Sequence, residues 1–364
     1  MTHQAVTSLR RLASFLEENQ DRLVIDADTH ATDTAALTGA ARERYESEPG
    51  YYHGRPISAE DLTSEMEMAS VDMALIWQNP AATQYTDDPD GNAEALLKAN
   101  QYICDAVSRY PNKFIPAGWT DPKACGVKNA IRIAEICVNE FGFPAVKMNP
   151  AQNRFPIDSP QVLAVVDRIV ELGAVPAFHF GADTPFTPAE GFEAVALRHP
   201  ENPILGVHMG GGGAGYLDAE ELYRKARDLG LRRANVRYVW SAKRETHIEA
   251  DLIAYQLAGP PFSSNIFCGS DAPYGRMTWN FGGFRAMFES LSRADRHADR
   301  RVRAHPDLFT PDVARAYLGG NFARFILAAC NRLVTAHAAS GALLGSGSAP
   351  VIGVEPKNSP SERS

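Results

Sequence analysis

Five acidic and imidazole side chains stand at the ends of short apolar runs of the sequence. They are Asp28, His30, His179, His208 and Asp271. Burying an unpaired charge in such surroundings costs several kcal/mol, so each of these groups needs a partner. Two carboxylates and two imidazoles, Asp28, Asp271, His30 and His179, would form a mixed ligand set for one divalent ion with a position left for water or substrate. His208 would stand beside it as a further ligand, or as a base or electrophile that acts on the substrate.

Each of these residues also has an ordinary structural explanation. A lone histidine at the end of a strand is often a hydrogen-bonded core residue. Asp28 could cap a loop, and Asp271, which precedes Ala-Pro, could belong to a turn. The joint pattern favours the metal site, because several predicted strands deliver a ligand type at the same end.

The apolar runs that carry these residues are short, regularly spaced and nearly continuous. Strands that are buried on both faces have this pattern, so the runs predict a parallel sheet. Eight strands are expected, at Leu23–Ala27, Met73–Trp77, Phe114–Trp119, Ala145–Met148, Val175–Phe180, Ile204–His208, Val236–Trp240 and Ile266–Gly269.

Helical patterns fill the intervals between these runs. Ser58 and Asp61 have the spacing of a capping box, and Gly173 and Gly230 are expected to end two helices. Strands that alternate with helices indicate an α/β fold, and eight such units favour a (β/α)8 TIM barrel. An open doubly wound sheet is the alternative, but no GxGxxG motif follows an early strand.

In such a barrel the active site forms at the C-terminal ends of the strands. Residues two apart on a strand point to the same side, so Asp28 and His30 project together towards the barrel mouth. His179 and Asp271 reach that mouth from the fifth and eighth strands. Lys147, on the fourth strand, would either bind a substrate carboxylate there or pair with Asp28.

Other side chains near the mouth are expected to bind the substrate. Trp77 and Trp119 each end a strand, where they would suit a planar or cyclic substrate or simply pack. Arg244 lies in a predicted loop and could hold a carboxylate bidentately, and Tyr274 follows the last strand. The long unassigned stretch 31–56 is predicted to form a lid over the barrel.

The composition excludes several classes of protein. A chain of 364 residues with a net charge of −8 lacks the basic surplus of a nucleic-acid scaffold. No apolar run is long enough for a membrane helix, and five scattered cysteines without CxxC spacing suit a reducing cytoplasm. We expect a cytoplasmic protein that acts on a small molecule, with no nucleic-acid or membrane partner, and leave a homodimer open.

Three segments are expected along the chain. Residues 1–22 predict an amphipathic N-terminal helix, because apolar residues recur at helical spacing among both acidic and basic ones. Residues 23–335 form the barrel domain. Residues 336–364, where Ala, Ser, Gly and Pro dominate before a polar end, are predicted to be a flexible tail.

Several segments together resemble the amidohydrolase superfamily. They are VIDADTH, PAVKMNP, PAFHFG, ILGVHMGG, NVRYVWS, IFCGSDAPYG and the closing GGNFARFIL. The likeness is to the amidohydrolase-related (amidohydrolase 2) branch that includes aminocarboxymuconate-semialdehyde decarboxylase, and it covers Val24 to Leu327. It implies a distorted barrel with one metal held by Asp28, His30, His179 and Asp271. It also implies that His208 orients or activates the attacking water or the substrate.

The chain departs from the usual pattern of this superfamily at its first ligand. The common motif is His-x-His, whereas this chain has Asp28-x-His30. An acidic ligand hardens the site, so manganese or magnesium competes with zinc. In binuclear members a lysine at the position of Lys147 is carbamylated and bridges two metals, but members of this branch generally work with one.

The resemblance leaves two chemistries open. In the first, which is the main expectation because SDAPYG resembles hydrolase-like members, a bound metal lowers the pKa of water towards about 7. Asp271 then takes its proton, and with the aid of His208 the hydroxide attacks an ester, lactone or amide. In the alternative, an aromatic or unsaturated acid is decarboxylated, and Asp271 or His208 protonates the carbon that loses CO₂. A barrel that only binds a ligand is a third reading, against which the full ligand set counts.

Overall fold

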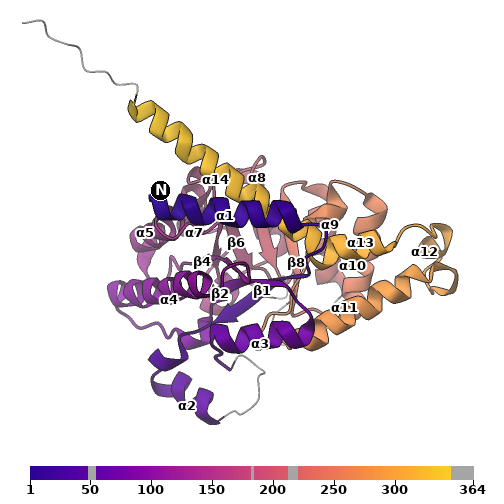
Figure 1. The fold of residues 1–364 in the computed structure, drawn as a ribbon, viewed down its shortest axis with the longest axis horizontal. Helices are drawn as coiled ribbons and strands as arrows, with labels where there is room; N and C mark the ends of the chain where they lie inside the picture. The colour runs from indigo at the N-terminus through magenta and orange to yellow at the C-terminus, as the bar shows by residue number, and fades with distance from the viewer. Residues whose placement is uncertain (48–54, 182–183, 212–219, 346–364) are drawn as a thin grey trace, which may run out of the picture.

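The computed structural model describes residues 1–47, 55–181, 184–211 and 220–345 as an α/β barrel of parallel strands (Figure 1). Hydrogen bonds join the strands in the orders β1-β2-β3 and β4-β5-β6-β7-β8-β9. The strands are β1 (Ile25–Ala31), β2 (Met73–Gln78), β3 (Phe114–Pro116), β4 (Gly118–Trp119), β5 (Ala145–Met148), β6 (Val175–His179), β7 (Ile204–Val207), β8 (Val236–Trp240) and β9 (Ile266–Cys268).

The third predicted strand is divided in two. Residues of β3 pair with β2, and residues of β4 pair with β5, so the run Phe114–Trp119 changes partner within six positions. Pro116 ends β3, and a proline has no N–H to offer to a neighbouring strand. The first strand begins two residues later than predicted and continues to Ala31, and the other strands lie within one or two residues of the apolar runs. The predicted α/β barrel, with its distortion, is confirmed.

The barrel closes between its first and last strands at the C-terminal end. Thr29 and Ala272 form a parallel bridge, and the N–H of Asp271 donates to the carbonyl of Asp28 at 2.9 Å. Gly269 permits this approach, because a Cβ there would lie only 3.1 Å from Cβ of Asp28. The seam of the barrel therefore passes through three of the four residues predicted to bind metal, Asp28, His30 and Asp271.

The helices surround the strands. They are α1 (His3–Asn19), α2 (Gly39–Ser47), α3 (Ala59–Ala69), α4 (Pro89–Arg109), α5 (Gly126–Asn139), α6 (Pro150–Asn153), α7 (Pro160–Glu171), α8 (Ala189–Arg198), α9 (Glu220–Arg232), α10 (Glu245–Ala258), α11 (Met277–Ser292), α12 (Arg300–Ala304), α13 (Pro311–Arg315) and α14 (Asn321–Gly345). A π-helical segment, Ala316–Gly320, joins α13 to α14.

Local sequence signals explain most of the helix ends. The Ser58–Asp61 capping box is present in full at the start of α3. Gly230 does not end its helix, since α9 continues to Arg232. A Cβ at Gly230 would collide with the Tyr255 hydroxyl, so this glycine serves close packing and not a C-cap.

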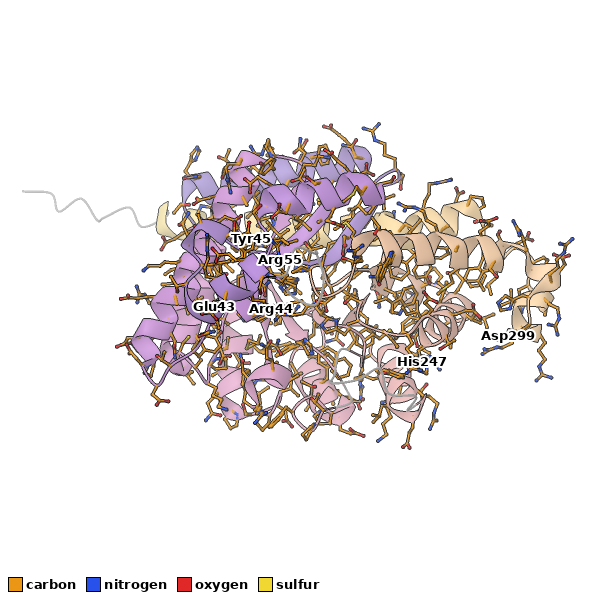
Figure 2. The ribbon with its side chains drawn as sticks, turned by 90° about the horizontal axis from the view of Figure 1, so that it is seen from below. Glu43, Arg44, Tyr45, Arg55, His247 and Asp299 are labelled. Carbon is orange, nitrogen blue, oxygen red and sulfur yellow. The ribbon has the colours of Figure 1, made fainter. Side chains whose placement is uncertain are left out.

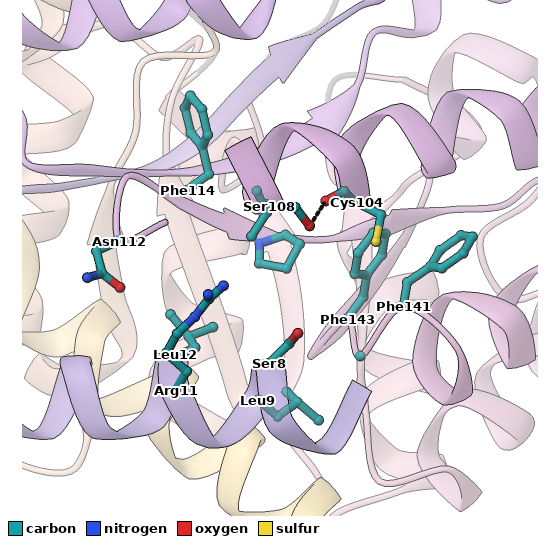
Figure 3. Close-up of a pocket in the computed structure, with 13 residues that line it drawn as sticks. Ser8, Leu9, Arg11, Leu12, Cys104, Ser108, Asn112, Phe114, Phe141 and Phe143 are labelled. Atoms are coloured by element: carbon teal, nitrogen blue, oxygen red, sulfur yellow. Dashed lines mark hydrogen bonds between the residues drawn. The ribbon is translucent and has the colours of Figure 1, made fainter. Parts of the chain in front are cut away.

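Helices α1 and α14 lie side by side across one end of the molecule (Figure 1). Leu9, Ala13 and Leu16 of α1 are buried there. The crevice between α1 and the strands has a volume of only about 40 Å³, too small for a substrate (Figure 3). This crevice therefore has no room for a substrate.

The predicted start of the tail differs from the structure, and the predicted lid is only partly described. The tail was expected to begin at residue 336, but α14 continues to Gly345, because the alanines and leucines that follow are strong helix formers. Residues 346–364 lie outside the described residues. The predicted lid, residues 31–56, contains helix α2. The most aromatic part of this stretch lies within residues 48–54, which are also outside the described residues. Among the described helices, none has the length and hydrophobicity needed to cross a membrane.

Candidate metal centre

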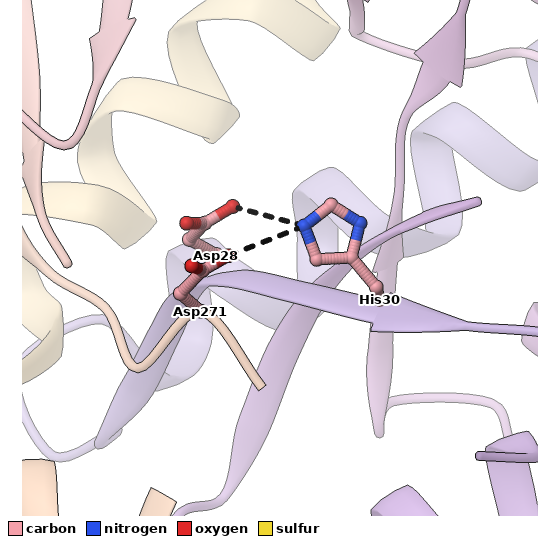
Figure 4. A group of neighbouring side chains, drawn as sticks. All are labelled: Asp28, His30 and Asp271. Carbon is pink, nitrogen blue, oxygen red and sulfur yellow. Dashed lines mark ion pairs between the residues drawn. The ribbon is translucent and has the colours of Figure 1, made fainter. Parts of the chain in front are cut away.

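Asp28, His30 and Asp271 meet at the seam of the barrel (Figure 4). One potential ligand atom from each lies within 4.8 Å of the other two. His30 Nε2 is 3.4 Å from Oδ1 of Asp271 and 3.9 Å from Oδ1 of Asp28. Two carboxylates around one imidazole nitrogen are a donor set suited to a divalent cation.

The orientation of His30 is fixed from behind. Its Nδ1 lies 2.8 Å from the main-chain carbonyl of Gln78, which can only accept, so Nδ1 carries the proton and Nε2 has the lone pair. The edges of Trp119 and Tyr274 flank the ring, with centroids 5.9 and 5.5 Å away. A histidine held in this way is typical of metal sites, where a second partner sets the tautomer.

Asp28 is completely buried and has three hydrogen-bond donors. Trp77 Nε1 and Lys147 Nζ donate to Oδ1 at 3.0 and 3.2 Å, and the Ser241 hydroxyl donates to Oδ2 at 2.8 Å. Burial acts to raise the pKa of Asp28, but the charge of Lys147 and the hydrogen bonds from Ser241 and Lys147 outweigh it and hold the pKa below its ordinary value. Asp28 is therefore an ionised carboxylate.

Lys147 takes one of the roles that the sequence left open, since it pairs with Asp28. Its ammonium group also lies over the rings of Trp77 and Trp119, 5.0 and 5.2 Å from their centres. Cation–π contacts of this kind stabilise a buried cation. The side chain is 1% exposed, so a second charge beside the metal ligands is built into the core.

Asp271 presents its carboxyl group at the edge of this cluster and remains 9% exposed. Burial raises the pKa of Asp271 above its usual range, and the charge of Asp28 acts in the same direction, against the contact with His30. A cation between the two carboxylates would relieve their repulsion. The residues present thus fit a divalent metal.

His179 and His208 form a pair next to this cluster. His208 Nε2 lies 3.0 Å from Nδ1 of His179, and His208 Nδ1 lies 2.8 Å from the hydroxyl of Ser241. Burial lowers the pKa of His208 well below its ordinary value, so its ring is neutral. The predicted ligand His179 lies outside the compact trio of Asp28, His30 and Asp271 in this structure.

Four residues after the strand ends have positive φ although none is glycine. They are His208 (79°), Met209 (46°), Ala242 (45°) and Asp271 (58°). Such conformations are unfavourable for most L-residues and are kept where the surrounding structure enforces them, often at functional sites. The backbone of this barrel is thus strained at the same end that holds the ionisable side chains.

A cavity of about 480 Å³ opens onto the cluster. Polar and aromatic side chains line it: His30, Arg44, Trp119, Lys147, Asn149, Gln152, His179, Thr184, His208, Asp271 and Tyr274. A volume of this size can hold a small aromatic molecule.

Comparison with known proteins bears on this arrangement. The sequence profile of the family described as Amidohydrolase matches residues 25–327. The chain belongs to this amidohydrolase family. The resemblance predicted from the motifs is confirmed, and the protein is a metal enzyme of the amidohydrolase superfamily.

Individual relatives of this amidohydrolase are distant. A 2-amino-3-carboxymuconate-6-semialdehyde decarboxylase of Dictyostelium discoideum is 24% identical over 115 residues, and the match spans 32% of each chain, about a third of that relative.

Two solved structures share the fold. One is a 5-carboxyvanillate decarboxylase of Novosphingobium aromaticivorans in complex with manganese (16% identity, TM-score 0.54, 82% of this chain and 96% of that one). The other is the 4-oxalomesaconate hydratase LigJ of Rhodopseudomonas palustris (18% identity, TM-score 0.55, 88% and 100%).

Two of the predicted substrate-binding residues lie outside the cavity of this amidohydrolase. Trp77 is fully buried behind Asp28, where it donates to the carboxylate. Arg244 borders a neighbouring hollow of about 460 Å³, together with Arg276. Tyr274 borders both hollows, and its hydroxyl donates to Oδ1 of Asn79 at 2.8 Å.

Sequence reasoning missed three residues that shape the site. Arg44 of α2 lines the cavity, and Figure 2 shows it beside Tyr45 and Arg55. Gln78 orients His30 through its carbonyl, and Ser241 bonds to Asp28 and His208. A main-chain carbonyl leaves no trace in a sequence, whereas Ser241 could have been suspected, because it directly follows a predicted strand.

Asp26 joins the first and last strands of the barrel through hydrogen bonds next to the site. Its Oδ1 accepts from the N–H groups of Asp28 (3.1 Å) and Ser270 (2.9 Å), and burial raises its pKa to about 8. Asp26→Asn keeps this accepting oxygen, so we expect it to change the free energy of unfolding by less than ~1 kcal/mol. Asp26→Ala leaves both buried N–H groups unpaired and should cost about 2–4 kcal/mol, to be measured by chemical denaturation. Equal losses in the two variants would contradict this account.

Proposed function

We propose that the protein is a metal-dependent carboxy-lyase that removes CO₂ from a small aromatic or unsaturated carboxylic acid. This was the alternative in the sequence analysis, and hydrolysis was the main expectation. Two of the three relatives described above are named as decarboxylases and none as a hydrolase, which supports the alternative better.

The metal would be held by Asp28, His30, Asp271 and His179. Hard carboxylate oxygens next to imidazole nitrogens suit manganese or zinc, and the manganese in the Novosphingobium enzyme supports the former. When bound, the ion would supply a Lewis acid that anchors the substrate carboxylate and a neighbouring oxygen. The ring nitrogen of His30 is already directed to this position by its bond to Gln78.

The observation that carries the proposal is the charge of the cavity lining. Arg44 faces the same space as the ligand cluster, with the amide side chains of Asn149 and Gln152 in the same wall. A decarboxylase must take up an anion, and a guanidinium group binds carboxylates and phenolates bidentately. A neutral ester, lactone or amide would make no use of such a cation.

Aromatic side chains shape the rest of the cavity. Trp119 and Tyr274 both line it, and both meet His30 with their ring edges. The two rings would confine a planar substrate beside the ligand cluster. The tyrosine is anchored by its bond to Asn79, so this wall is fixed before the substrate arrives.

Asp271 is placed to be the proton donor. The proton of its carboxyl group passes to the ring or alkene carbon that bears the carboxylate. The C–C bond to that carboxylate then breaks, its electron pair returns to the ring or double bond, and CO₂ leaves. Asp271 regains its proton from solvent, to which it is partly exposed. The positions of Asp271 at the cavity wall and of Lys147 beside Asp28 support this division of roles.

The test is an assay of the full chain, stripped of metal by a chelator and reloaded with Mn²⁺ or Zn²⁺. Hydroxybenzoic acids with adjacent carboxyl and hydroxyl groups, unsaturated dicarboxylic acids and lactones would be supplied separately in D₂O. We expect CO₂ release from an acid, a product with one deuterium at the carbon that lost the carboxylate, and no turnover without metal. Ring opening of a lactone without CO₂ would show a hydrolase instead, and full activity of the stripped protein would refute the metal requirement.

A further inference from the structure

We propose that the protein has a second binding site, separate from the one at the metal ligands, for a small carboxylate with an apolar body. The site is a cavity of about 340 Å³ between α2, the end of β2 and α4, here called the second cavity. Gln78 and Asn79 border this cavity and also bond to residues of the metal centre, so they couple the two sites. This coupling, unlike the site itself, rests on the metal centre of the proposed function.

The second cavity is distinct from the cavity of about 480 Å³ that opens onto the ligand cluster. Pro80 and Ala81 line the larger cavity, whereas Ala82 and Thr83 line the second one, so this short segment divides them. In the described part of the chain, no residue lines both cavities. An occupant of the second cavity would thus leave the ligand cluster accessible to a substrate.

Three polar side chains at the second cavity each have a buried atom without a hydrogen-bond partner. These atoms are Thr32 Oγ1, Gln78 Nε2 and Asn79 Nδ2. Only seven side-chain atoms are in this state among the residues that the structure describes, so three of them lie around one cavity. Buried polar atoms almost always have a partner, and each exception needs an explanation. A ligand with oxygen atoms would supply the missing partners.

The unpartnered amide atoms are donors. Asn79 Oδ1 accepts from the N–H of Ala81 at 2.9 Å, and because an N–H can only donate, this bond identifies the other amide atom as Nδ2. Gln78 Oε1 accepts from the hydroxyl of Thr83 at 2.9 Å, which leaves Nε2 without a partner. The last torsion of an Asn or Gln side chain is broad, so a small rotation turns either nitrogen towards an occupant. The pair therefore selects a ligand with acceptor oxygens.

The charge and the walls of the second cavity narrow the ligand further. Lys98 of α4 lines the cavity, is exposed, and forms no ion pair with any described residue. Asp33, the one acid in the described lining, directs Oδ1 to the N–H of Ala35 at 3.1 Å. A carboxylate is the acceptor that can use both amide donors and the ammonium group. The other walls are mostly small and apolar, which suits a hydrocarbon body: Ala36, Leu37, Ala41, Ala82, Ala95 and Ala99.

Gln78 and Asn79 also hold parts of the metal centre. The main-chain carbonyl of Gln78 lies 2.8 Å from Nδ1 of His30, and Asn79 Oδ1 accepts from the hydroxyl of Tyr274 at 2.8 Å. A ligand bonded to both amide side chains would restrain the segment that orients His30. A metal ion bound to His30 would restrain the same segment, so each would bind more tightly in the presence of the other.

The first experiment locates the ligand by NMR. The full chain, freed of metal and labelled with ¹⁵N at its Asn and Gln side-chain amides, would be titrated with benzoate. We expect saturable shifts of the Gln78 and Asn79 amide signals, with a dissociation constant of about 1 mM or lower. The amides of Asn149 and Gln152 line the larger cavity and report separately on binding there. Benzyl alcohol, which lacks the carboxylate, should bind about tenfold more weakly or worse.

The second experiment fills the cavity. Ala99→Leu places a larger side chain at its wall and preserves α4, because leucine is a strong helix former. It should weaken benzoate binding about tenfold or more, as measured at the Gln78 and Asn79 signals. Gln101→Leu introduces the same side chain on the same helix, outside the cavity lining, and should bind benzoate like the unmodified protein.

The third experiment measures the coupling by calorimetry with Mn²⁺. Saturating benzoate should raise the affinity of the unmodified protein for Mn²⁺ by about 5-fold or more, and should have a much smaller effect in Ala99→Leu. This variant separates coupling from direct contact of benzoate with the ion in the larger cavity, because such contact would raise the affinity equally in both proteins. An equal rise in both proteins, or no rise in either, would overturn the coupling.

Two results would overturn the site itself. One is the absence of shifts at Gln78 and Asn79 when benzoate exceeds about 10 mM, including the case in which only Asn149 and Gln152 respond. The other is equal benzoate affinity in Ala99→Leu and Gln101→Leu, with melting temperatures that show both to be folded. Neither depends on turnover, so a failure of the carboxy-lyase assay would leave these measurements readable.

Discussion

Asp271→Asn should lower kcat by about 10²–10⁴-fold at saturating Mn²⁺, which is the contribution of a positioned general acid. Asparagine has the shape of the carboxyl group but no acidic proton, so carbon protonation fails. The fold should persist, because Asn tolerates the left-handed conformation that Asp271 adopts (φ 58°).

The measurement must separate the two parts that Asp271 plays. If it were only a ligand, raising the Mn²⁺ concentration would restore kcat. If it is the proton donor, kcat stays low when calorimetry shows the site to be filled. Asp105→Asn, an exposed carboxylate on α4, is the control and should keep full activity. A kcat within tenfold of the unmodified enzyme for Asp271→Asn would remove Asp271 as the acid.

Asp251→Ala should cause the largest loss of stability of any change considered, about 3–5 kcal/mol, because it leaves buried cations without their counter-charge. Asp251 is fully buried on α10 between two cations: Arg227 Nε is 2.6 Å from Oδ1, and Lys243 Nζ bonds to Oδ2. Lys243 also donates to the carbonyl of Met209, the residue after His208. The substitution should therefore loosen the strained loop that carries His208 as well.

An exposed ion pair provides the contrast. Asp167 bonds to Arg198 and His199 on the surface, at 2.6 and 2.8 Å. Asp167→Ala should cost no more than about 1 kcal/mol, because surface pairs are solvated and screened. Unfolding in urea, followed by circular dichroism, gives both values. Similar midpoints for the two variants would contradict the role assigned to Asp251.

Much of the barrel could be predicted because its signals are local. Strands buried on both faces leave continuous apolar runs, and an ionisable residue at the end of such a run is conspicuous, as Asp28, His179 and Asp271 were. The split at Pro116 was not predicted, because it depends on which neighbour each half of the strand pairs with. Helix α14 runs past the predicted boundary, since composition hides the helix-forming strength of its alanines.

The supporting residues of the site were harder to predict. Ser241 and Asp28 are 213 positions apart, so the bond between them exists only in the folded barrel. Arg44 lines the cavity from the stretch 31–56, which was left unassigned and predicted to form a lid. Its role depends on where α2 lies, and nothing in its immediate neighbours distinguishes it from a solvated surface arginine.

The seam that closes the barrel determines when the site can form during synthesis of the chain. The N–H of Ser270 donates to Asp26, which is 244 positions earlier in the sequence. Strand β1 can therefore pair with β9 only after nearly the whole domain has been synthesised. During synthesis Asp28 and His30 emerge long before Asp271, and no shorter fragment can assemble all three. A bound ion would contact ligands from both the first and the last strand of the barrel. Binding of the metal would therefore require that the whole barrel has been synthesised and has closed.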